Sequence, residues 1–525
     1  MPRQRRRVLV AFSALPALAL AGCMVGPNFT RPETDVAGHY QNAANLQTGP
    51  VNEALWWENF RDPTLSNLIQ AGYENNLSLQ VAGARVLQAR AQLAAAVGEL
   101  YPQQQGAFGA YTYERQSQAA PTNFKGADTY LNVAELGFTA TWELDFWGKF
   151  RRAIQANDAA FLGSIDAYDA ALVTLTADIA TSYVSIRTLQ AQIQVAGTNI
   201  TVQTESLRIA NAQYHAGQTS LLDVEQAQTQ LGTTEATLPT LRAQLGVQED
   251  ALAVLLGTTQ DKIAPLLAGS GAIPQAPAGV AVGIPKDLLR QRPDVREAEL
   301  AAASQSALIG VAKAQLFPAL SLSGTFGWES SSSNGASLGD LFNWSSRAIT
   351  LGPSVQIPLF NYGQLTNQVR AQDAAFEQSI LTYQNIVLQA QQQVQDAITN
   401  YVQAQQSVAA LTGAVQSAVQ ATNLAMIRYV DGAADYTTVL TAEQAQLQVQ
   451  NSLAIAQGNV PQALVALYTG LGGGWQIADG HDVLPDRIKA DMARRTNWGG
   501  LLAPPAHAAP ASRAQQIRQT YVPNW

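Results

Sequence analysis

The stretch Leu388-Gln-Ala-Gln-Gln-Gln-Val-Gln-Asp-Ala-Ile398 lies inside a long segment, Pro358 to Pro461, that contains no proline between its ends. The chain has 23 prolines among 525 residues, so chance does not readily explain such a gap. Proline is the residue that a helix interior tolerates least, whereas Gln, Ala and Leu suit a helix. The segment therefore predicts helix along most of its length.

One short break divides this segment. Arg428-Tyr-Val-Asp-Gly-Ala-Ala-Asp435 places Gly432 where the chain can reverse, because glycine tolerates positive φ. We predict two long helices joined by a tight turn at Gly432. The first arm, roughly Gln364 to Arg428, would be on the order of 100 Å long at 1.5 Å per residue. No ordinary globular domain needs such a helix.

The same pattern occurs earlier in the chain. Lys149 to Leu238 is also free of proline and contains the break Gln213-Tyr-His-Ala-Gly217. Several landmarks recur at an almost constant offset. Tyr214 and Gly217 precede Tyr429 and Gly432 by 215 residues, Gly148 precedes Gly363 by 215, and Tyr101-Pro102 precedes Phe317-Pro318 by 216. These landmarks predict an internal duplication.

The N-terminus has the pattern of a secretory signal with a lipid-attachment site. Arg3, Arg5, Arg6 and Arg7 precede an apolar run, which ends in Leu20-Ala-Gly-Cys23. Cys23 is the only cysteine, so it cannot form an internal disulfide. We predict cleavage before Cys23 and acylation of its thiol; the alternative is a buried, unreactive thiol. Met24 follows, and no Asp is present there to suggest inner-membrane retention.

Charge narrows the classes of partner. Loss of the signal removes four Arg and no acid, so the net charge falls by four from −8 to −12. This negative net charge argues against the binding of nucleic acid and against docking to a membrane through a polybasic surface. The mature chain has no apolar run of about 18 residues, so a portion that spans a membrane would have to use strands.

Two strands are predicted after each aromatic–proline pair. From Leu136 to Phe146 apolar residues alternate with polar ones, which include Glu143 and Asp145. Leu320 to Trp328 and Ile349 to Leu359 alternate similarly, and the pattern near Gln103 to Glu114 is weaker. Acids on one face fit a membrane strand whose apolar face contacts lipid and whose polar face contacts water. The alternative is a half-buried sheet of a soluble protein. The polar loops Gln116–Thr129 and Glu329–Arg347 would face outward.

Four strands cannot close a membrane barrel, whose minimum is about eight. Two copies would supply eight strands and three copies twelve. The sequence pattern therefore requires an oligomer but leaves dimer and trimer open.

Five stretches resemble the TolC-like outer-membrane factor family, in its lipoprotein branch serving tripartite efflux systems. They are Cys23-Met-Val-Gly-Pro-Asn-Phe-Thr-Arg-Pro32, Trp56-Trp57 with Asp62-Pro63, Ile284-Pro285 with Arg292-Pro-Asp-Val-Arg296, Arg428-Tyr429 with Gly432, and Leu471-Gly-Gly-Gly-Trp475. The resemblance implies a mainly α fold with a β-barrel membrane portion. In it, long helical hairpins form a periplasmic α-barrel, and a homotrimer contributes four strands per chain to a twelve-stranded outer-membrane barrel.

The resemblance also implies a function and partners. The chain would be a passive duct in the outer membrane, contacting a periplasmic adaptor, an inner-membrane transporter and outer-membrane lipid. The sequence leaves open whether drugs, metal ions or aromatic acids are exported. A periplasmic coiled-coil scaffold held only by lipid and a lipidated surface enzyme are the alternative classes.

The predicted domains follow the duplication. They are a signal peptide (1–22), a lipidated extended segment (23–60), repeat 1 (61–268), a linker (269–285), repeat 2 (286–475) and a partly disordered tail (476–525). Asp62 is predicted to cap a helix with Pro63 in its first turn.

No catalytic constellation is evident. His215 is the only His inside the repeats, and neither a His-Glu-x-x-His pattern nor a phosphate-binding loop occurs. We predict no enzyme activity, metal or cofactor.

The two turns are the candidate functional site. The resemblance implies that the duct closes at these periplasmic tips, where acids and hydrogen-bonded side chains crowd the axis. Tyr429 and Gly432 match the family pattern, but Thr438 and Thr441 occupy positions where acids are often found. The acids that remain nearby are Asp431 and Asp435 in repeat 2 and Asp223 and Glu225 in repeat 1.

Two kinds of contact are predicted at these tips. Arg428 and Tyr429 would pair with acids of the neighbouring hairpin, above all Asp223. The alternative is that Asp223 and Asp435 cap the helices that restart after each turn. The adaptor would meet the tips at Tyr214–Ser220 and Tyr429–Asp435, which include Gly217, Gln218 and Ala433.

Overall fold

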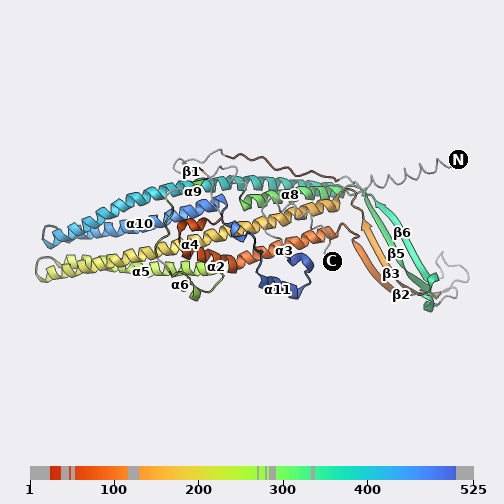
Figure 1. Ribbon diagram of the computed structural model, residues 1–525, viewed down its shortest axis with the longest axis horizontal. Helices are drawn as coiled ribbons and strands as arrows, with labels where there is room; N and C mark the ends of the chain where they lie inside the picture. The colour runs from red at the N-terminus through yellow and green to blue at the C-terminus, as the bar shows by residue number, and fades with distance from the viewer. Residues whose placement is uncertain are drawn as a thin grey trace.

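The computed structural model describes residues 24–36, 47–48, 54–115, 117, 129–268, 271–277, 281–282, 291–332 and 337–503. The predicted signal peptide and Cys23 lie outside these residues. The described chain is elongated, with two helical hairpins at one end and a four-stranded sheet at the other (Figure 1).

The helices follow the predicted duplication. The first hairpin is α4 (Lys149–His215) with α5 (Leu221–Leu255), and the second is α9 (Gln364–Val430) with α10 (Tyr436–Leu471). Both α4 and α9 have 67 residues, and they begin and end 215 positions apart. The shorter helices α3 (Leu77–Gly98) and α8 (Pro293–Ala314) both have 22 residues and are offset by 216. The internal duplication is therefore confirmed.

The second arm of each hairpin is longer than the proline-free stretch suggests. Pro239 lies inside α5 and Pro461 inside α10, and both helices continue for several turns beyond them. A proline in a helix loses one backbone hydrogen bond and crowds the preceding turn. Pro461 is buried in the folded chain, where packing against neighbouring helices offsets that local cost.

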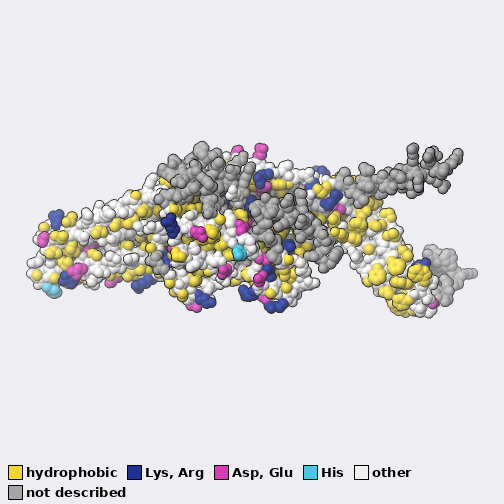
Figure 2. Space-filling model, in the orientation of Figure 1, with side chains coloured by type: hydrophobic (Ala, Val, Ile, Leu, Met, Phe, Trp, Pro, Cys, Tyr) yellow, Lys and Arg dark blue, Asp and Glu magenta, His cyan; other side chains and the backbone are white. Residues whose placement is uncertain are grey.

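The strands form one antiparallel sheet in the order β2-β3-β5-β6. They are β2 (Gln104–Arg115), β3 (Tyr130–Glu143), β5 (Ala319–Ser331) and β6 (Arg347–Gln356). All four predicted strands are confirmed, including the weakly patterned first one. The alternating pattern ran too far at two strand ends, because Phe146 and Leu359 lie beyond β3 and β6. Hydrophobic side chains cover the visible face of the sheet (Figure 2).

Two helices from each repeat lie in one row. From one side of the molecule to the other the order is α3, α4, α8, α9 (Figure 1). The sheet has the same order of repeats, with β2 and β6 at its edges. Each repeat therefore leaves one helix and one strand at an outer edge of the described chain.

Aromatic residues near the N-terminus fix the middle of the molecule. The 3-10 helix η2 (Trp56–Phe60) places Trp56 against Tyr468 of α10, with ring centroids 5.6 Å apart and nearly parallel planes. α2 (Pro63–Asn75) begins as predicted: Asp62 accepts from the backbone N–H of Thr64 at 2.9 Å. These contacts join the N-terminal segment to both repeats.

The Arg292-Pro-Asp-Val-Arg296 motif joins repeat 2 to the core. Buried Arg292 donates to the carbonyl of Gly470 at 2.5 Å, and Arg296 pairs with Asp166 of α4 at 2.5 Å. Gly472 ends α10 with φ 80°, and a Cβ there would lie 2.9 Å from Cγ of Arg292. The glycines after Leu471 therefore allow both the turn and the close approach of this arginine.

The tail folds back as far as it is described. It contains η6 (Trp475–Ala478), α11 (Asp486–Arg495) and η7 (Gly499–Leu502). Arg90 of α3 donates to the carbonyls of Leu501 at 2.9 Å and Ala503 at 2.7 Å. Partial disorder was predicted for the tail as a whole (476–525). Residues 476–503 are described and contain these short helices, and residues 504–525 lie outside the described residues.

The remaining elements are short. They are β1 (Gln47–Thr48), η3 (Gln260–Lys262), α6 (Ile263–Leu266), β4 (Ala281–Val282), which pairs in parallel with β1, η4 (Leu338–Asp340) and η5 (Trp344–Ser346). None of the described helices combines enough length with enough apolar character to cross a membrane.

Candidate functional site at the hairpin ends

The two turns have the same backbone geometry and lie together at the end of the molecule farthest from the sheet (Figure 1). Gly217 has φ 72°, and the N–H of Gln218 donates to the carbonyl of Gln213 at 2.9 Å. Gly432 has φ 69°, and the N–H of Ala433 donates to the carbonyl of Arg428 at 2.7 Å. Both are left-handed helix ends. Since an added Cβ would meet no atom within 4 Å at either glycine, only φ requires glycine there.

A small apolar cluster joins the two hairpins just behind the turns. This tip cluster draws on all four long helices and consists of Ala210, Val224, Ala227, Ala425, Tyr429, Tyr436 and Val439. The rings of Tyr429 and Tyr436 meet edge to face with centroids 5.3 Å apart. Because these residues are buried against one another, the hairpin ends form one packed unit.

The predicted contact between Tyr429 and Asp223 is present. The Tyr429 hydroxyl donates to Oδ2 of Asp223 at 3.2 Å, and the hydroxyl of Thr219 donates to the same oxygen. Burial raises the pKa of Tyr429, and the charge of Asp223 adds to the effect. The phenol therefore keeps its proton at neutral pH and remains a donor.

Arg428 bonds its own turn within the single chain, and its predicted pairing with acids of the neighbouring hairpin stays a prediction. Its guanidinium is exposed and donates to the carbonyl of Ala433 in its own turn at 3.3 Å. It has no ion-pair partner among the residues that the structure describes. A cation in the last turn of a helix is stabilised by nearby free carbonyl groups, which explains why the guanidinium of Arg428 bonds its own turn.

The capping alternative holds for Asp435 but not for Asp223. Asp435 is the N-cap of α10 and accepts from the backbone N–H of Thr438 at 3.1 Å. Ser220 is the N-cap of α5, so Asp223 lies within the first turn. The other predicted tip residues are exposed: Tyr214, Gln218, Glu225, Asp431 and Ala433.

Sequence reasoning missed the contacts that join the hairpins behind the tip. Gln213 donates to the carbonyl of Tyr429 at 3.3 Å. Farther back, polar side chains of α4 meet those of α10: Ser185 with Gln462 (3.1 Å), Gln192 with Asn451 (2.9 Å), Asn199 with Gln450 (2.7 Å) and Ser206 with Glu443. We call these pairs the polar seam.

The polar seam follows a seven-residue period. Its α4 members, together with Gln213, are residues 185, 192, 199, 206 and 213. A period of seven keeps side chains on one face of two helices that supercoil. In most such helix pairs that face is apolar, whereas here it is polar. The seven-residue spacing of polar residues was the signal in the sequence that could have revealed the seam.

Glu443 is the one carboxyl group in the polar seam. It is 2% exposed, accepts from the hydroxyl of Ser206, and its Oε2 has no hydrogen-bond partner among the described residues. The hydroxyl of Tyr436, one heptad earlier on α10, also has no partner there. Burial raises the pKa of Glu443, because the charged form loses its hydration.

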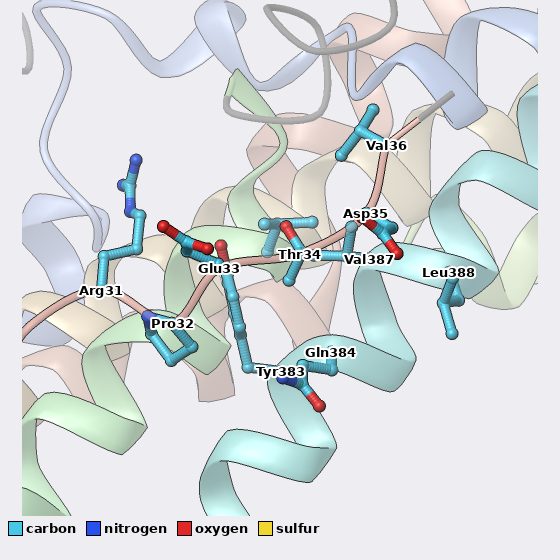
Figure 3. Close-up of a pocket in the computed structure, with 11 residues that line it drawn as sticks. Arg31, Pro32, Glu33, Thr34, Asp35, Val36, Tyr383, Gln384, Val387 and Leu388 are labelled. Atoms are coloured by element: carbon cyan, nitrogen blue, oxygen red, sulfur yellow. The ribbon is translucent and has the colours of Figure 1, made fainter. Parts of the chain in front are cut away.

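A groove lies far from these tips. It has a volume of about 740 Å³ and lies between residues 31–36 and α9, where Figure 3 shows Gln384 and Leu388 beside the extended chain. Arg31 pairs with Glu299 of α8, and Gln391 donates to the carbonyl of Asp35 at 3.0 Å. Within the described ranges, no group of three His, Cys, Asp or Glu is placed to hold a metal ion.

Comparisons with known proteins cover nearly the whole chain. Residues 68–258 and 284–473 match the family model described as outer membrane efflux protein. Nodulation protein T of Rhizobium leguminosarum bv. viciae is 30% identical, over 89% of this chain and 93% of that protein. Cation efflux system protein CusC of Escherichia coli O6:H1 is 29% identical, over 88% and 97%. The solved outer-membrane channel OprN superposes with a TM-score of 0.80 at 29% identity, over 86% of this chain and 100% of that one.

Proposed function

This chain belongs to the outer membrane efflux protein family, and from that membership we propose that it is the channel subunit of a tripartite efflux pump. Three copies would close their strands into one outer-membrane barrel of twelve strands, continued by their helical hairpins through the periplasm. The observation that carries the proposal is the placement of one four-stranded sheet and two equal hairpins at opposite ends of the chain. Such a molecule suits a passive duct and not a catalyst.

We place the contact with a periplasmic adaptor at the two turns. Tyr214, Gln218, Asp431 and Ala433 are exposed there, and Leu221 is exposed beside them at the start of α5. Because both turns end at the same level, one adaptor hairpin could touch both. An inner-membrane transporter would complete the pump below the adaptor.

We place the closure of the duct at the same end. The contact of Tyr429 with Asp223 and the packed tip cluster hold the two hairpins together. Separation of the hairpins would have to break this contact first. A wide polar duct touches cargo only weakly, so we assign selection of cargo to the transporter and the adaptor.

We propose lipid anchoring at Cys23 in addition to the strands. Its neighbours are fixed next to the membrane end of the helices: the N–H of Val25 donates to the carbonyl of Trp147 at 3.1 Å. Acyl chains on Cys23 would therefore enter the inner leaflet close to the end of β3.

Reconstitution tests the duct. The purified full chain is placed in planar lipid bilayers, and its mass in detergent is measured in parallel. We expect discrete conductance steps from a species of trimeric mass. A monomeric, water-soluble chain without conductance would overturn the proposal.

Site-specific crosslinking tests the tip contact. A photoreactive residue at Gln218 or Ala433 should capture an adaptor protein in cells. The same residue at Trp344, which is exposed near the start of β6, is the matched control. Capture from Trp344 alone would exclude the tips as the adaptor site.

A further inference from the structure

The two faces of the sheet carry opposite charges. The four strands of the sheet contain six charged residues, which are four acids and two arginines. Because side chains alternate along a strand, the pairing of the strands assigns each of these residues to a face. Both arginines, Arg115 and Arg347, lie on the apolar face. All the acids lie on the other face, among serines, threonines and glycines: Glu114, Glu135, Glu143 and Glu329.

The apolar face is the one that would contact lipid. Its large side chains lie in neighbouring rows of the sheet and are 40 to 74% exposed. A charge in the middle of such a face is costly, and the cost falls toward the edge where lipid headgroups begin. The two arginines lie at that edge. Arg115 is the last residue of β2 and Arg347 the first of β6, at the end of the sheet away from the helices (Figure 1).

Each arginine lies over an aromatic ring. The guanidinium carbon of Arg115 is 5.7 Å from the ring centroid of Tyr130, which stacks on Tyr113. The guanidinium carbon of Arg347 is 4.2 Å from the ring centroid of Trp344, and Arg347 also donates to the carbonyl of Trp344 at 2.6 Å. Both arginines are exposed. An aromatic ring holds a guanidinium in place without neutralising its charge, so most of the N–H donors remain available to a ligand.

Neither arginine has an ion-pair partner among the described residues. Glu114, next to Arg115, points to the opposite face of the sheet. Asp340 lies seven residues before Arg347, and its carboxylate accepts from the side chain of Asn343 at 2.9 Å and from the backbone N–H of Ser337 at 3.1 Å. These two positive charges are therefore left uncompensated.

The cations at the other end of the sheet are paired. Lys149 lies 3.0 Å from a carboxylate oxygen of Glu143, and Arg151 lies 2.9 Å from a carboxylate oxygen of Asp145. This end adjoins the helices, so it would lie at the inner leaflet. The uncompensated arginines are thus found only at the outward rim of the described sheet, which suits a membrane whose two leaflets differ in charge.

The duplication did not supply either arginine. At the offset of 215 residues, the counterpart of Arg115 is Ser330 and that of Arg347 is Asn132. Each hairpin therefore places an exposed arginine over an aromatic ring at the outward rim, but from a different position in the repeat. This recurrence favours one requirement shared by both hairpins over a remnant of the ancestral repeat.

We propose that Arg115 and Arg347 bind the phosphate groups of the glycolipid in the outer leaflet of the outer membrane. The proposal rests on the channel proposed above, because it takes the apolar face of the sheet to contact lipid. Lipid A, the phosphorylated glycolipid of that leaflet, carries its phosphates on sugars directly above the acyl chains. The planar guanidinium group can donate two parallel hydrogen bonds to a phosphate. The exposed rings of Tyr130 and Trp344 lie where sugar and acyl chain meet.

Thermal unfolding of the purified full-length channel in detergent tests the proposal. The channel is titrated with lipid A or with lipid A from which both phosphates have been removed. A lipid that binds the folded state raises the melting temperature. We expect lipid A to stabilise the wild type and the dephosphorylated lipid to have little effect. In the double variant Arg115→Gln with Arg347→Gln, the midpoint of the titration should lie about tenfold higher, because charge-assisted hydrogen bonds are lost.

Two further variants separate the site from net charge. Arg242→Gln removes an exposed arginine of α5, far from the sheet, and should titrate like the wild type (Figure 1). The double variant Arg115→Lys with Arg347→Lys keeps the charge but loses the planar group, so its midpoint should fall between those of the wild type and the glutamine variant.

Three results would overturn the proposal. They are equal stabilisation of the wild type by both lipids, an unchanged midpoint in the glutamine double variant, and equal stabilisation by inorganic phosphate without lipid, which would indicate a site for free anions. Conductance and mass of the same preparations are measured in parallel. Any of these results in a conducting oligomer leaves the proposed channel intact, whereas a monomeric wild type without conductance would contradict the channel itself.

Discussion

The hydroxyl of Tyr429 reaches across from the second hairpin to the carboxylate of Asp223 in the first, at 3.2 Å. This contact joins α9 to α5 beside both turns. It is supported by Thr219, which donates to the same oxygen, and by the edge-to-face contact of Tyr429 with Tyr436.

Removal of this contact should loosen the closed tip. Tyr429→Phe keeps the ring and deletes the donor, and a hydrogen bond to a charged group contributes about 1.5–3 kcal/mol. We expect the purified channel to show a larger resting conductance, with a similar effect for Asp223→Ala. Arg428→Ala is the control, because Arg428 donates to a carbonyl of its own turn and not to Asp223 among the described residues. A lower melting temperature with unchanged conductance would show that the contact stabilises the tip but does not close the duct.

The polar seam should make stability depend on pH through Glu443. The folded chain raises the pKa of this carboxyl, so it holds the proton more tightly than the unfolded chain does. The contribution of Glu443 to stability is therefore greatest below its ordinary pKa of 4.5. It falls as pH rises from there to the raised folded value and is constant above it.

Glu443→Gln should remove this dependence, because the amide fills the same space without a charge. We expect a higher melting temperature than the wild type at neutral pH and a smaller difference near pH 4. Glu225→Gln, at an exposed position of α5, is the control. Parallel melting curves across pH for the wild type and Glu443→Gln would contradict the prediction.

Two glycines of α9 and its turn should respond in opposite directions to alanine. Gly432 has φ 69°, where an alanine costs about 1–2 kcal/mol, so Gly432→Ala should lower the melting temperature. Gly413 lies inside α9, with no atom within 4 Å of an added Cβ, so Gly413→Ala should raise stability by about 1 kcal/mol. Thermal denaturation in detergent measures both. A stabilising Gly432→Ala would show that the turn does not need its left-handed residue.

The lipid on Cys23 should not be the only attachment to the membrane. Cys23→Ser behind a conventional signal peptide removes the acylation site. We expect the variant to remain in the membrane fraction, because a single lipid signal adds only modest anchoring and closed strands require hydrocarbon. Recovery of all the protein in the soluble fraction would rule out strands that span the membrane.

Long-range repetition made most of the fold predictable. The spacing of Gly217 from Gly432 and of Gly148 from Gly363 placed both ends of α4 and α9. A left-handed backbone conformation at a helix end favours glycine, so these ends can be recognised from the sequence. Pro461 misled the estimate of the second arm, since proline is disfavoured by local geometry and tertiary packing can outweigh that cost. β2 was weakly patterned because small and polar residues fill much of it.

The tip was less predictable because its contacts depend on helix rotation. The pairing of Tyr429 with Asp223 could be predicted, because the hydroxyl of Tyr429 is a donor and the carboxylate of Asp223 is an acceptor. Arg428 is adjacent to Tyr429 in sequence but about 100° away around the helix, so it faces solvent and could not reach the same acid. Glu443 was overlooked because an isolated acid in a Gln-rich helix normally indicates a solvated face.

The equal lengths of α4 and α9 constrain how this chain can change over evolution. Both turns must arrive at one level for the tip cluster to form, and four successive seven-residue positions of α4 each meet a partner on α10. A deletion within one arm would displace its turn and misalign every pair beyond the cut. Insertions and deletions should therefore survive only as whole heptads made in both repeats at once, so that the two halves must change length together.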